Sequence, residues 1–482
     1  MKKNHLFGMF AMAAFAFASC SQDEVVTQSP EVNKAIEFGT YVGRDAQSRG
    51  SVITQGGSTA DGNGTITTDA LAEKGFGVFA YYTDESSYVS GDDVATDVTE
   101  TGSPCNFMYN QGVTGVATTL NGVTTYSTTD WSYSPVKYWP NDPGDKLTFF
   151  AYAPHDDADN SANASEYDNI SFNAQTNMKG DPIITFSVNS EVQHQQELLI
   201  SKTKNIDKVK NTSQNGVTVT DKVNFQFAHA LARIGFTVKA ITDEVSATDK
   251  KLDENTIIVL KKVMLAKDAG SENDVPSEGI FFESGTLNLN QQEVNMAEGT
   301  SYNPVEWENT EGNQMFTLGK DHFETQTAQV GTSLKDFQQA FNLGITQGFV
   351  INGGANGNST SANKLNNDES YVMIIPQDLS TSVNYFHVYV EYDVITVDGN
   401  LNNDLTQYDG LKSKVTNHIS TKVEGLNFVA GKAYTLNLQL GMTSVKVTAD
   451  VDTWVNVDGT NVDLPQNTPT PTPPAQEGVV ES

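Results

Sequence analysis

The sequence predicts an all-β protein built of β-sandwiches, with little helix. The 482 residues include 17 Tyr and 24 Phe, and together with abundant Thr and Val they favour strands. Short apolar runs, often alternating with polar residues, recur between stretches rich in Gly, Asn, Ser and Pro. A helical spacing of apolar residues is convincing only in Ser333–Leu343. Many short strands with frequent turns are typical of β-sandwiches.

Strand candidates follow one another along most of the chain. The segment 222–240 alternates twice, and AHALAR between the two runs fits either a helical turn or a strand crossover. The polar segment 211–216 is expected to separate two domains, and the loop 353–369 is expected to be exposed. The other predicted strands cover residues 36–42, 75–83, 113–118, 122–126, 147–153, 184–188, 197–202, 256–265, 285–289, 371–376, 386–397 and 432–440.

The N-terminus has the pattern of an export signal. Lys2 and Lys3 precede the apolar run Leu6–Ala18, which is too short to cross a bilayer comfortably and ends just before Cys20. The sequence FASC resembles a lipobox, so we expect cleavage before Cys20 and lipidation of its thiol, palmitate included. A plain secretory signal that is cleaved nearby is the alternative.

The composition excludes several classes of function. The net charge of −31 would repel phosphate backbones, so nucleic acid is not an expected partner.

Cys105 has no cysteine partner if Cys20 is lipidated. No GxSxG, HExxH, P-loop, Rossmann or CxxC motif is present, so we predict no catalytic residue, metal or cofactor. His229 is expected to be a hydrogen-bonded core or edge residue. A hydrolase that uses two of the 60 carboxylates stays open only as a remote alternative.

Four segments together resemble the Bacteroidetes fimbrillins, the FimA/Mfa-like subunits of type V pili. They are IEFGTYVGRDAQSRG, YWPND with LTFFAYAP, VNFQFAHALARIGFTV and GKAYTLNLQLGMTSVKVTADVDTW. The resemblance implies two transthyretin-like β-sandwich domains in tandem. The chain then divides into a signal peptide (1–19), a lipid tether with a removable first strand (20–50), an N-terminal sandwich (51–216), a C-terminal sandwich (217–465) and a Pro/Thr-rich tail (466–482).

The resemblance also implies a route of assembly. An Arg-specific protease would remove the anchor and the strand Ile36–Val42, and a C-terminal strand of another subunit would fill the groove. Arg49 is the preferred cleavage site and Arg44 the second choice, although both could simply be surface arginines. The donor candidates on one side of the last strand are Val445, Val447, Ala449 and Val451, followed by Trp454 as an anchor. A last strand that folds into its own domain is the alternative.

The leading hypothesis is therefore a non-enzymatic structural subunit of a surface fimbria, first held in the outer membrane by lipid. Its partners would be other fimbrial subunits, the protease and a host or bacterial surface ligand. The tail after Leu464 leaves open whether it is a stalk, tip or accessory subunit. The alternative is a monomeric glycan-binding lipoprotein that stacks sugars on Trp131, Tyr133, Tyr138 and Trp139. Because Tyr138, Phe149 and Tyr152 are expected to point inward, packing is favoured over sugar binding.

Overall fold

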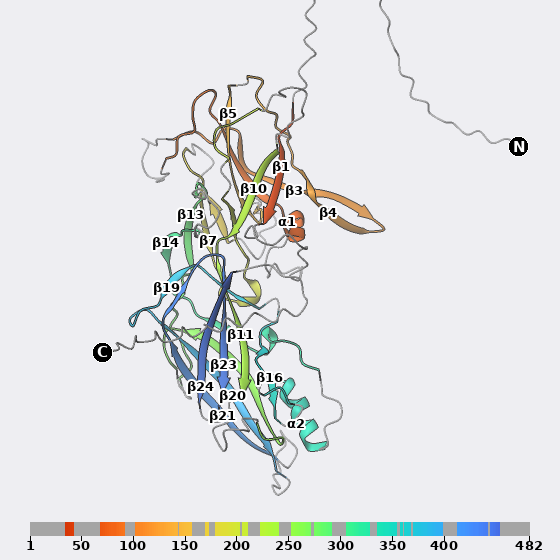
Figure 1. Cartoon of the computed structure of the whole chain (residues 1–482), viewed down its shortest axis with the longest axis vertical. Helices are drawn as coiled ribbons and strands as arrows, with labels where there is room; N and C mark the ends of the chain where they lie inside the picture. The colour runs from red at the N-terminus through yellow and green to blue at the C-terminus, as the bar shows by residue number, and fades with distance from the viewer. Residues whose placement is uncertain are drawn as a thin grey trace, which may run out of the picture.

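The fold is all-β with two α-helices and two short 3-10 helices among the described residues, which confirms the predicted class (Figure 1). The computed structural model describes residues 34–42, 68–91, 102–142, 144–156, 169–172, 179–202, 205–210, 222–240, 252–270, 274–291, 305–327, 335–353, 357–359, 361–367, 370–398, 412–441 and 444–453. The helices are α1 (Thr68–Lys74), which was not predicted, α2 (Lys335–Ile345), η1 (Val192–His194) and η2 (Lys320–His322).

An eight-stranded sheet forms the upper part of the molecule in Figure 1. Its strands run in the order β1-β10-β8-β5-β2-β3-β4, and β9 pairs with β5. The sheet curls so that β1 and β4, at opposite ends of this order, contact each other. It encloses an apolar cluster rich in Phe. The strands are β1 (Glu37–Val42), β2 (Phe76–Tyr82), β3 (Met108–Leu120), β4 (Val123–Ser132), β5 (Lys146–Ala153), β8 (Leu199–Ser201), β9 (Lys208–Val209) and β10 (Lys222–His229).

A four-stranded sheet of order β14-β13-β7-β6 covers the other face of this sheet. The ring of Phe172 packs 5.4 Å from Phe79 and 5.1 Å from Tyr152, measured between ring centroids. Its members are β6 (Ile170–Phe172), β7 (Ile183–Ser187), β13 (Ser284–Asn288) and β14 (Glu308–Glu311). Two strand pairings, β7 with β13 and β10 with β8, cross the boundary predicted at 211–216. The division into domains stays a prediction.

Two five-stranded sheets form the lower sandwich, with a large apolar core between them. Helix α2 packs on the outer face through Ala340 and Phe341, against Ile257, Val259 and Ile395. One sheet contains β11 (Ala232–Ala240), β17 (Asn363–Lys364), β18 (Val372–Ile374), β23 (Lys432–Leu440) and β24 (Val445–Thr453). The other contains β12 (Thr256–Ala266), β15 (Phe316–Leu318), β16 (Phe349–Asn352), β20 (Phe386–Val397) and β21 (Lys412–Val423), and β19 (Gln377–Leu379) pairs separately with β22 (Leu426–Phe428).

The link between the upper and lower parts is short and buried. Strand β10 ends at His229 and β11 begins at Ala232, so the AHALAR segment is a strand crossover. Ala230 and Leu231 are fully buried. The Ala230 N–H donates to the Leu198 carbonyl at 2.9 Å, and the Ala230 carbonyl accepts from Trp307 Nε1 at 2.7 Å. The Leu231 carbonyl accepts from the Gly431 N–H at 2.9 Å.

Two expectations about polar and loop residues have different outcomes. His229 is buried and hydrogen-bonds through Nδ1 to the buried carboxylate of Glu197, which confirms that it is a core residue. The loop 353–369 was expected to be exposed, and this is wrong for part of it. Its described residues include β17, and Leu365 and Asn366 are buried because they line the edge of β11, where Asn366 Oδ1 accepts from the Phe236 N–H.

A buried carboxylate joins the loop after β2 to the four-stranded sheet. Asp181 accepts hydrogen bonds from the hydroxyls of Tyr88 and Ser90 at 2.9 and 2.7 Å. It also accepts from the side-chain amides of Asn288 and Asn290, each at 3.0 Å. Four donors therefore depend on one side chain.

We predict that Asp181→Ala lowers the free energy of unfolding by about 3 kcal/mol or more, because several part-buried donors lose a charged acceptor. Urea denaturation followed by circular dichroism measures the change. Asp130→Ala, at an exposed carboxylate, is the control and should change stability by less than about 0.5 kcal/mol. Equal effects of the two substitutions would contradict this role of Asp181.

Burial raises the pKa of the Cys105 thiol to about 12. The thiolate is the reactive form, so we predict that iodoacetamide alkylates Cys105 very slowly at about pH 8 in the folded chain and rapidly in urea. Mass spectrometry of a Cys20→Ser chain measures both rates. Similar rates in the two conditions would contradict the predicted burial.

Candidate functional site: strand β1, its groove, and strand β24

Strand β1 lies at one end of the eight-stranded sheet and pairs along its length only with β10, in parallel. The register runs from Glu37 opposite Lys222 to Val42 opposite Phe227. Parallel pairing is slightly less stable per residue than antiparallel pairing. The backbone of β1 is therefore held more weakly than that of a strand inside the sheet.

On the other side, a second segment holds the residues that immediately precede this strand. The Ile36 N–H donates to the Lys137 carbonyl at 2.9 Å, and the Trp139 N–H donates to the Lys34 carbonyl at 3.0 Å. The Tyr133 hydroxyl donates to the Ile36 carbonyl at 2.9 Å. Strand β1 thus occupies the gap between β10 and the segment that follows β4.

The side chains of Ile36 and Phe38 anchor β1 in the apolar cluster, and each is only 2% exposed. The Phe38 ring stacks on Phe225 at 5.8 Å and meets Tyr133 edge-on at 5.2 Å. Burial of two such side chains contributes roughly 1.5–3 kcal/mol each. If β1 left, it would uncover a groove of aromatic and aliphatic side chains that includes Phe76, Tyr133, Trp139, Phe149, Val223 and Phe225.

The strand at the other end of the chain is also an edge strand. β24 lies last in its sheet and pairs only with β23, in antiparallel register from Val445 opposite Leu440 to Thr453 opposite Lys432. Of the donor candidates, Val445, Val447 and Ala449 pack partly against the core. Val451 is 51% exposed. In this monomer β24 belongs to its own sandwich, yet it is covered on one edge only.

Several predicted site residues lie outside the described part of the chain. These are Cys20, Arg44, Arg49, Trp454 and the tail 466–482. Strand β1 ends at Val42, so both arginines follow it closely in sequence. Their roles remain predictions.

The aromatic residues considered for sugar stacking are mostly packed. Trp139 is buried, and Trp131 and Tyr133 are half-buried beside Phe76 and Phe38. The inward orientation predicted for Phe149 and Tyr152 is confirmed, but that of Tyr138 is wrong, because Tyr138 is 51% exposed. The bridge of Tyr138 to Ala35 turns its neighbour Trp139 inward, since adjacent residues of an extended segment face opposite sides.

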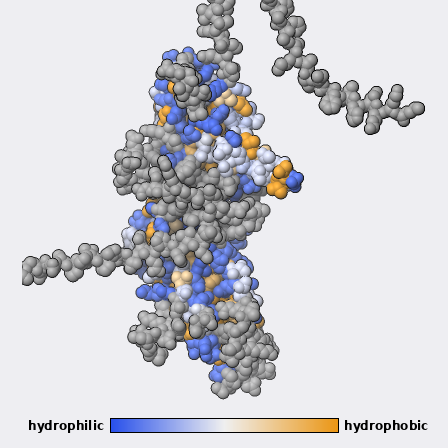
Figure 2. Space-filling view, turned by 45° about the vertical axis from the view of Figure 1, so that its right-hand side comes forward, coloured by the Kyte–Doolittle hydropathy of each residue, from blue (hydrophilic) through white to orange (hydrophobic). Residues whose placement is uncertain are grey.

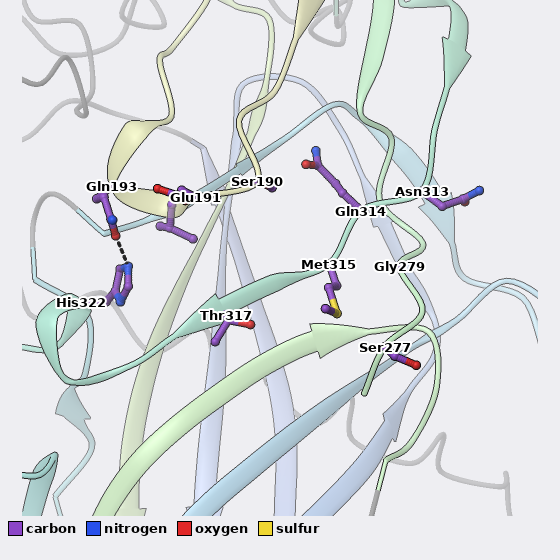
Figure 3. Close-up of a pocket in the computed structure, with 11 residues that line it drawn as sticks. Ser190, Glu191, Gln193, Ser277, Gly279, Asn313, Gln314, Met315, Thr317 and His322 are labelled. Carbon is purple, nitrogen blue, oxygen red and sulfur yellow. Dashed lines mark hydrogen bonds between the residues drawn. The ribbon is translucent and has the colours of Figure 1, made fainter. Parts of the chain in front are cut away.

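An open hollow of about 480 Å³ lies beside η1 (Figure 3). His322 Nδ1 accepts from the Gly319 N–H at 3.1 Å, so Nε2 carries the proton toward Gln193 Oε1 at 2.6 Å. Burial also lowers the pKa of His322, which keeps its imidazole neutral. No Phe, Tyr or Trp is among the lining residues, which are Ser190, Glu191, Val192, Gln193, Ser277, Gly279, Asn313, Gln314, Met315, Thr317 and His322. Both ring nitrogens of His322 are engaged by Gly319 and Gln193, and the lining contains no sugar-stacking ring.

Two further features of the described residues bear on possible functions. No group of three or more His, Cys, Asp or Glu among them is placed to hold a metal ion. None of their helices has the length and apolar character needed to cross a bilayer.

We predict that Phe38→Ala weakens β1 by about 3 kcal/mol or more, because it leaves a cavity among aromatic rings. Glu37→Ala, on the exposed side of the same strand, should have little effect. Hydrogen exchange of residues 34–42, measured by mass spectrometry, reports the opening of β1 separately from global unfolding. Equal exchange in both variants would contradict the anchoring role of Phe38.

Sequence reasoning missed the partners of β1. The alternation of β10 was visible in VNFQF, but nothing in the sequence paired it with a strand some 180 residues earlier in the chain. The contacts of Tyr133, Lys137 and Trp139 with residues 34–36 likewise depend on the closure of the sheet.

Comparison with known proteins agrees with this architecture. Residues 67–311, about half of the chain, match the model of the fimbrillin-like family. Over 246 residues the chain is 29% identical to fimbrium subunit Fim1C of Phocaeicola vulgatus, and the match covers 51% of this chain and 53% of that protein. The chain therefore aligns with only about half the length of this curated relative.

One solved structure shows the same fold. A fimbrial protein from Bacteroides vulgatus superposes with a TM-score of 0.51 at 20% identity, covering 88% of this chain and 100% of that one. A fimbrilin from Porphyromonas gingivalis has a TM-score of 0.34 at 10% identity, covering 88% and 99%. Because the family model matches more than half of the sequence, the chain belongs to the fimbrillin-like family of fimbrial proteins.

Proposed function

We propose that this protein is a structural subunit of a cell-surface fimbria that polymerises by exchange of an edge strand. In this proposal the chain is exported as a lipoprotein anchored at Cys20, and an Arg-specific protease cuts after Arg49 or Arg44. Cleavage frees β1, and β24 of another subunit takes its place beside β10. The mature chain then leaves the outer membrane anchor and joins the fimbria, where it takes part in adhesion.

The observation that carries the proposal is the position of β1. It is an edge strand joined along its length only to β10, and Phe38, with Ile36 just before the strand, is nevertheless buried in the core. A strand held in this way can detach without breaking the rest of the sheet. Its departure would expose an apolar groove and one row of backbone donors and acceptors on β10. These are the features that strand addition uses, with backbone hydrogen bonds for affinity and side-chain pockets for specificity.

Strand β24 has the pattern that such a groove requires. Val445, Val447, Ala449 and Val451 alternate with polar residues, as Ile36 and Phe38 flank Glu37 at the start of β1. Only β23 has to release it, because β24 has no second strand neighbour. The hydrogen bond from Thr421 Oγ1 to the Val445 carbonyl, 3.0 Å long, would also have to break.

The alternative, a monomeric glycan-binding lipoprotein, has little support in the packing. Three of its four aromatic residues contribute to the surroundings of β1, and only Tyr138 is well exposed. One exposed tyrosine does not form a stacking platform. A hydrolase would need a pair of acids that face a cleft, and the hollow beside η1 contains a single carboxylate, that of Glu191. A second hollow, of about 270 Å³, is lined by Asp321 and Glu324, but Glu324 is paired with Lys364 Nζ at 2.8 Å.

We predict that limited digestion with an Arg-specific protease converts the purified chain into a ladder of oligomers on native gels. Arg49→Ala should slow ladder formation, and Arg44→Ala combined with Arg49→Ala should abolish it. Mass spectrometry of the new N-terminus identifies the cleaved bond. A chain that loses residues 34–49 and stays monomeric would refute strand exchange.

The donor strand is tested with a matched pair of substitutions. Val447→Asp puts a charge on the inner side of β24, and Thr448→Asp puts the same charge on its exposed side. Only Val447→Asp should prevent ladder growth, since an unpaired charge would enter the apolar groove. Cleaved Val447→Asp chains should still accept a strand from the native chain, and this readout separates loss of donor function from misfolding.

A further inference from the structure

A second unprotected edge belongs to the hairpin of β3 and β4. Beyond a register shift between Gly115 and Ala117, the two strands continue as a ribbon in which Ala117 pairs with Tyr126 and Leu120 with Val123. We call residues 117–126 the distal ribbon. Its turn, Asn121-Gly122, has φ values of +53° and +80°, as a two-residue type I′ hairpin loop requires. Figure 1 shows the ribbon projecting sideways from the upper part of the molecule.

The distal ribbon is exposed on both faces and ends in apolar side chains. Leu120 is 72% exposed and Val123 is 64% exposed, although they are direct cross-strand neighbours. Figure 2 shows hydrophobic atoms at the projecting tip. An isolated two-stranded ribbon is only marginally stable in water, so an extension with no core to cover is costly to maintain. Partners that would cover it are absent from the described part of the chain.

The charge of the ribbon differs from that of the rest of the protein. Residues 108–129 contain no Asp, Glu, Lys or Arg, in a chain whose net charge is −31. Exposed edge strands normally carry charges or prolines that prevent pairing with another chain. Along β4 the first charged residue is Asp130, which lies beyond the ribbon. The edge thus lacks the usual protection against pairing.

From these features we infer that the outer edge of β4 in the distal ribbon pairs with the same edge of a second copy of this chain. Two molecules of equal negative charge repel each other, and a neutral ribbon that projects from the sheet lets them meet with the least repulsion. A joint between identical edges is self-complementary, as a two-fold dimer interface must be. The contact would join subunits side by side, and it requires neither cleavage nor the exchange of β1.

The geometry of the hairpin selects a register for this joint. Residues that flank a two-residue loop hydrogen-bond to each other, so Val123 and Thr125 direct their backbone groups toward β3. Thr124 and Tyr126 then direct theirs outward, toward the second copy. In one register, the outward backbone groups of Thr124 and Tyr126 are all hydrogen-bonded in both copies. This register places Thr124 of each copy opposite Tyr126 of the other, and the two Thr125 residues opposite each other. A shift toward the turn would lose Tyr126, and a shift away from it would enter the irregular backbone after Ser127.

The proposed joint satisfies the side chains as well as the backbone. Thr–Thr pairs and pairs of an aromatic with a β-branched residue are favourable across antiparallel strands. The joint also converts two marginal ribbons into one four-stranded sheet, of order β3-β4-β4-β3. On its surface the exposed Val123 of each copy comes to lie opposite Ser127 of the other copy.

A cysteine cross-link tests the register directly. In an uncleavable chain carrying Cys20→Ser, Cys105→Ser, Arg44→Ala and Arg49→Ala, Thr125→Cys brings two thiols face to face. Directly opposed, non-hydrogen-bonded residues have Cα atoms about 4.5 Å apart, within the range of a disulfide. With oxidised glutathione as the oxidant, we expect a disulfide-linked dimer on non-reducing gels. Thr119→Cys, also at an exposed position but on β3, should stay monomeric. No dimer from Thr125→Cys, or equal yields from both variants, would overturn the proposal.

A charge substitution tests the contact without a covalent cross-link. Thr125→Glu places two like charges opposite each other in the joint, whereas Thr119→Glu adds the same charge one strand away from it, on β3 opposite Thr124. Sedimentation equilibrium of the uncleaved chain should show dimerisation about fivefold weaker for Thr125→Glu than for Thr119→Glu. Equal association of the two variants would overturn the proposal. So would a monomeric chain whose ribbon instead binds phosphatidylcholine vesicles through Leu120 and Val123.

Discussion

The packing of Phe38 between β10 and the segment after β4 is the contact on which the upper half of the molecule depends. The eight-stranded sheet curls until its two ends approach, and β1 fills the remaining gap. The Phe38 ring contacts Phe225 of β10 on one side and Tyr133, just after β4, on the other. A single short strand therefore completes a core that is otherwise built from distant parts of the chain.

The three notable strands of this protein share one property. β1, β4 and β24 each end a sheet, and each has one strand neighbour along most of its length. Soluble proteins usually protect such edges, because unpaired backbone groups recruit other chains. Here β1 is kept in place by apolar anchors, β24 has an alternating apolar face, and β4 has a neutral exposed ribbon. The proposed function uses these edges for assembly.

Local patterns in the sequence were sufficient for the elements themselves. The predicted strands 386–397 and 432–440 have the bounds of β20 and β23, because a long run rich in β-branched and aromatic residues indicates the first and regular alternation indicates the second. Tyr138 was misplaced because its orientation depends on a single bridge to Ala35, far away in sequence. The short helix α1 was missed because seven residues give too little periodicity.

The pairing of strands that are distant in the chain could not be predicted from the sequence. No local pattern shows that β1 lies parallel to β10, or that β7 pairs with β13 across the expected boundary. Such contacts depend on which surfaces remain uncovered after the nearby strands have paired. The alternation at Val445–Val451 identified the amphipathic last strand, yet its position at a sheet edge became clear only from the topology.

The crossover at Ala230 and Leu231 has a mechanical consequence. Both residues are buried and their backbone groups are bonded to residues of other segments, so the two halves are connected without a hinge. A rod of such units would resist bending inside each subunit and would flex only where one subunit meets the next. The stiffness of a filament would then be governed by its joints, and a load applied at one end would reach the other without being absorbed within the subunits.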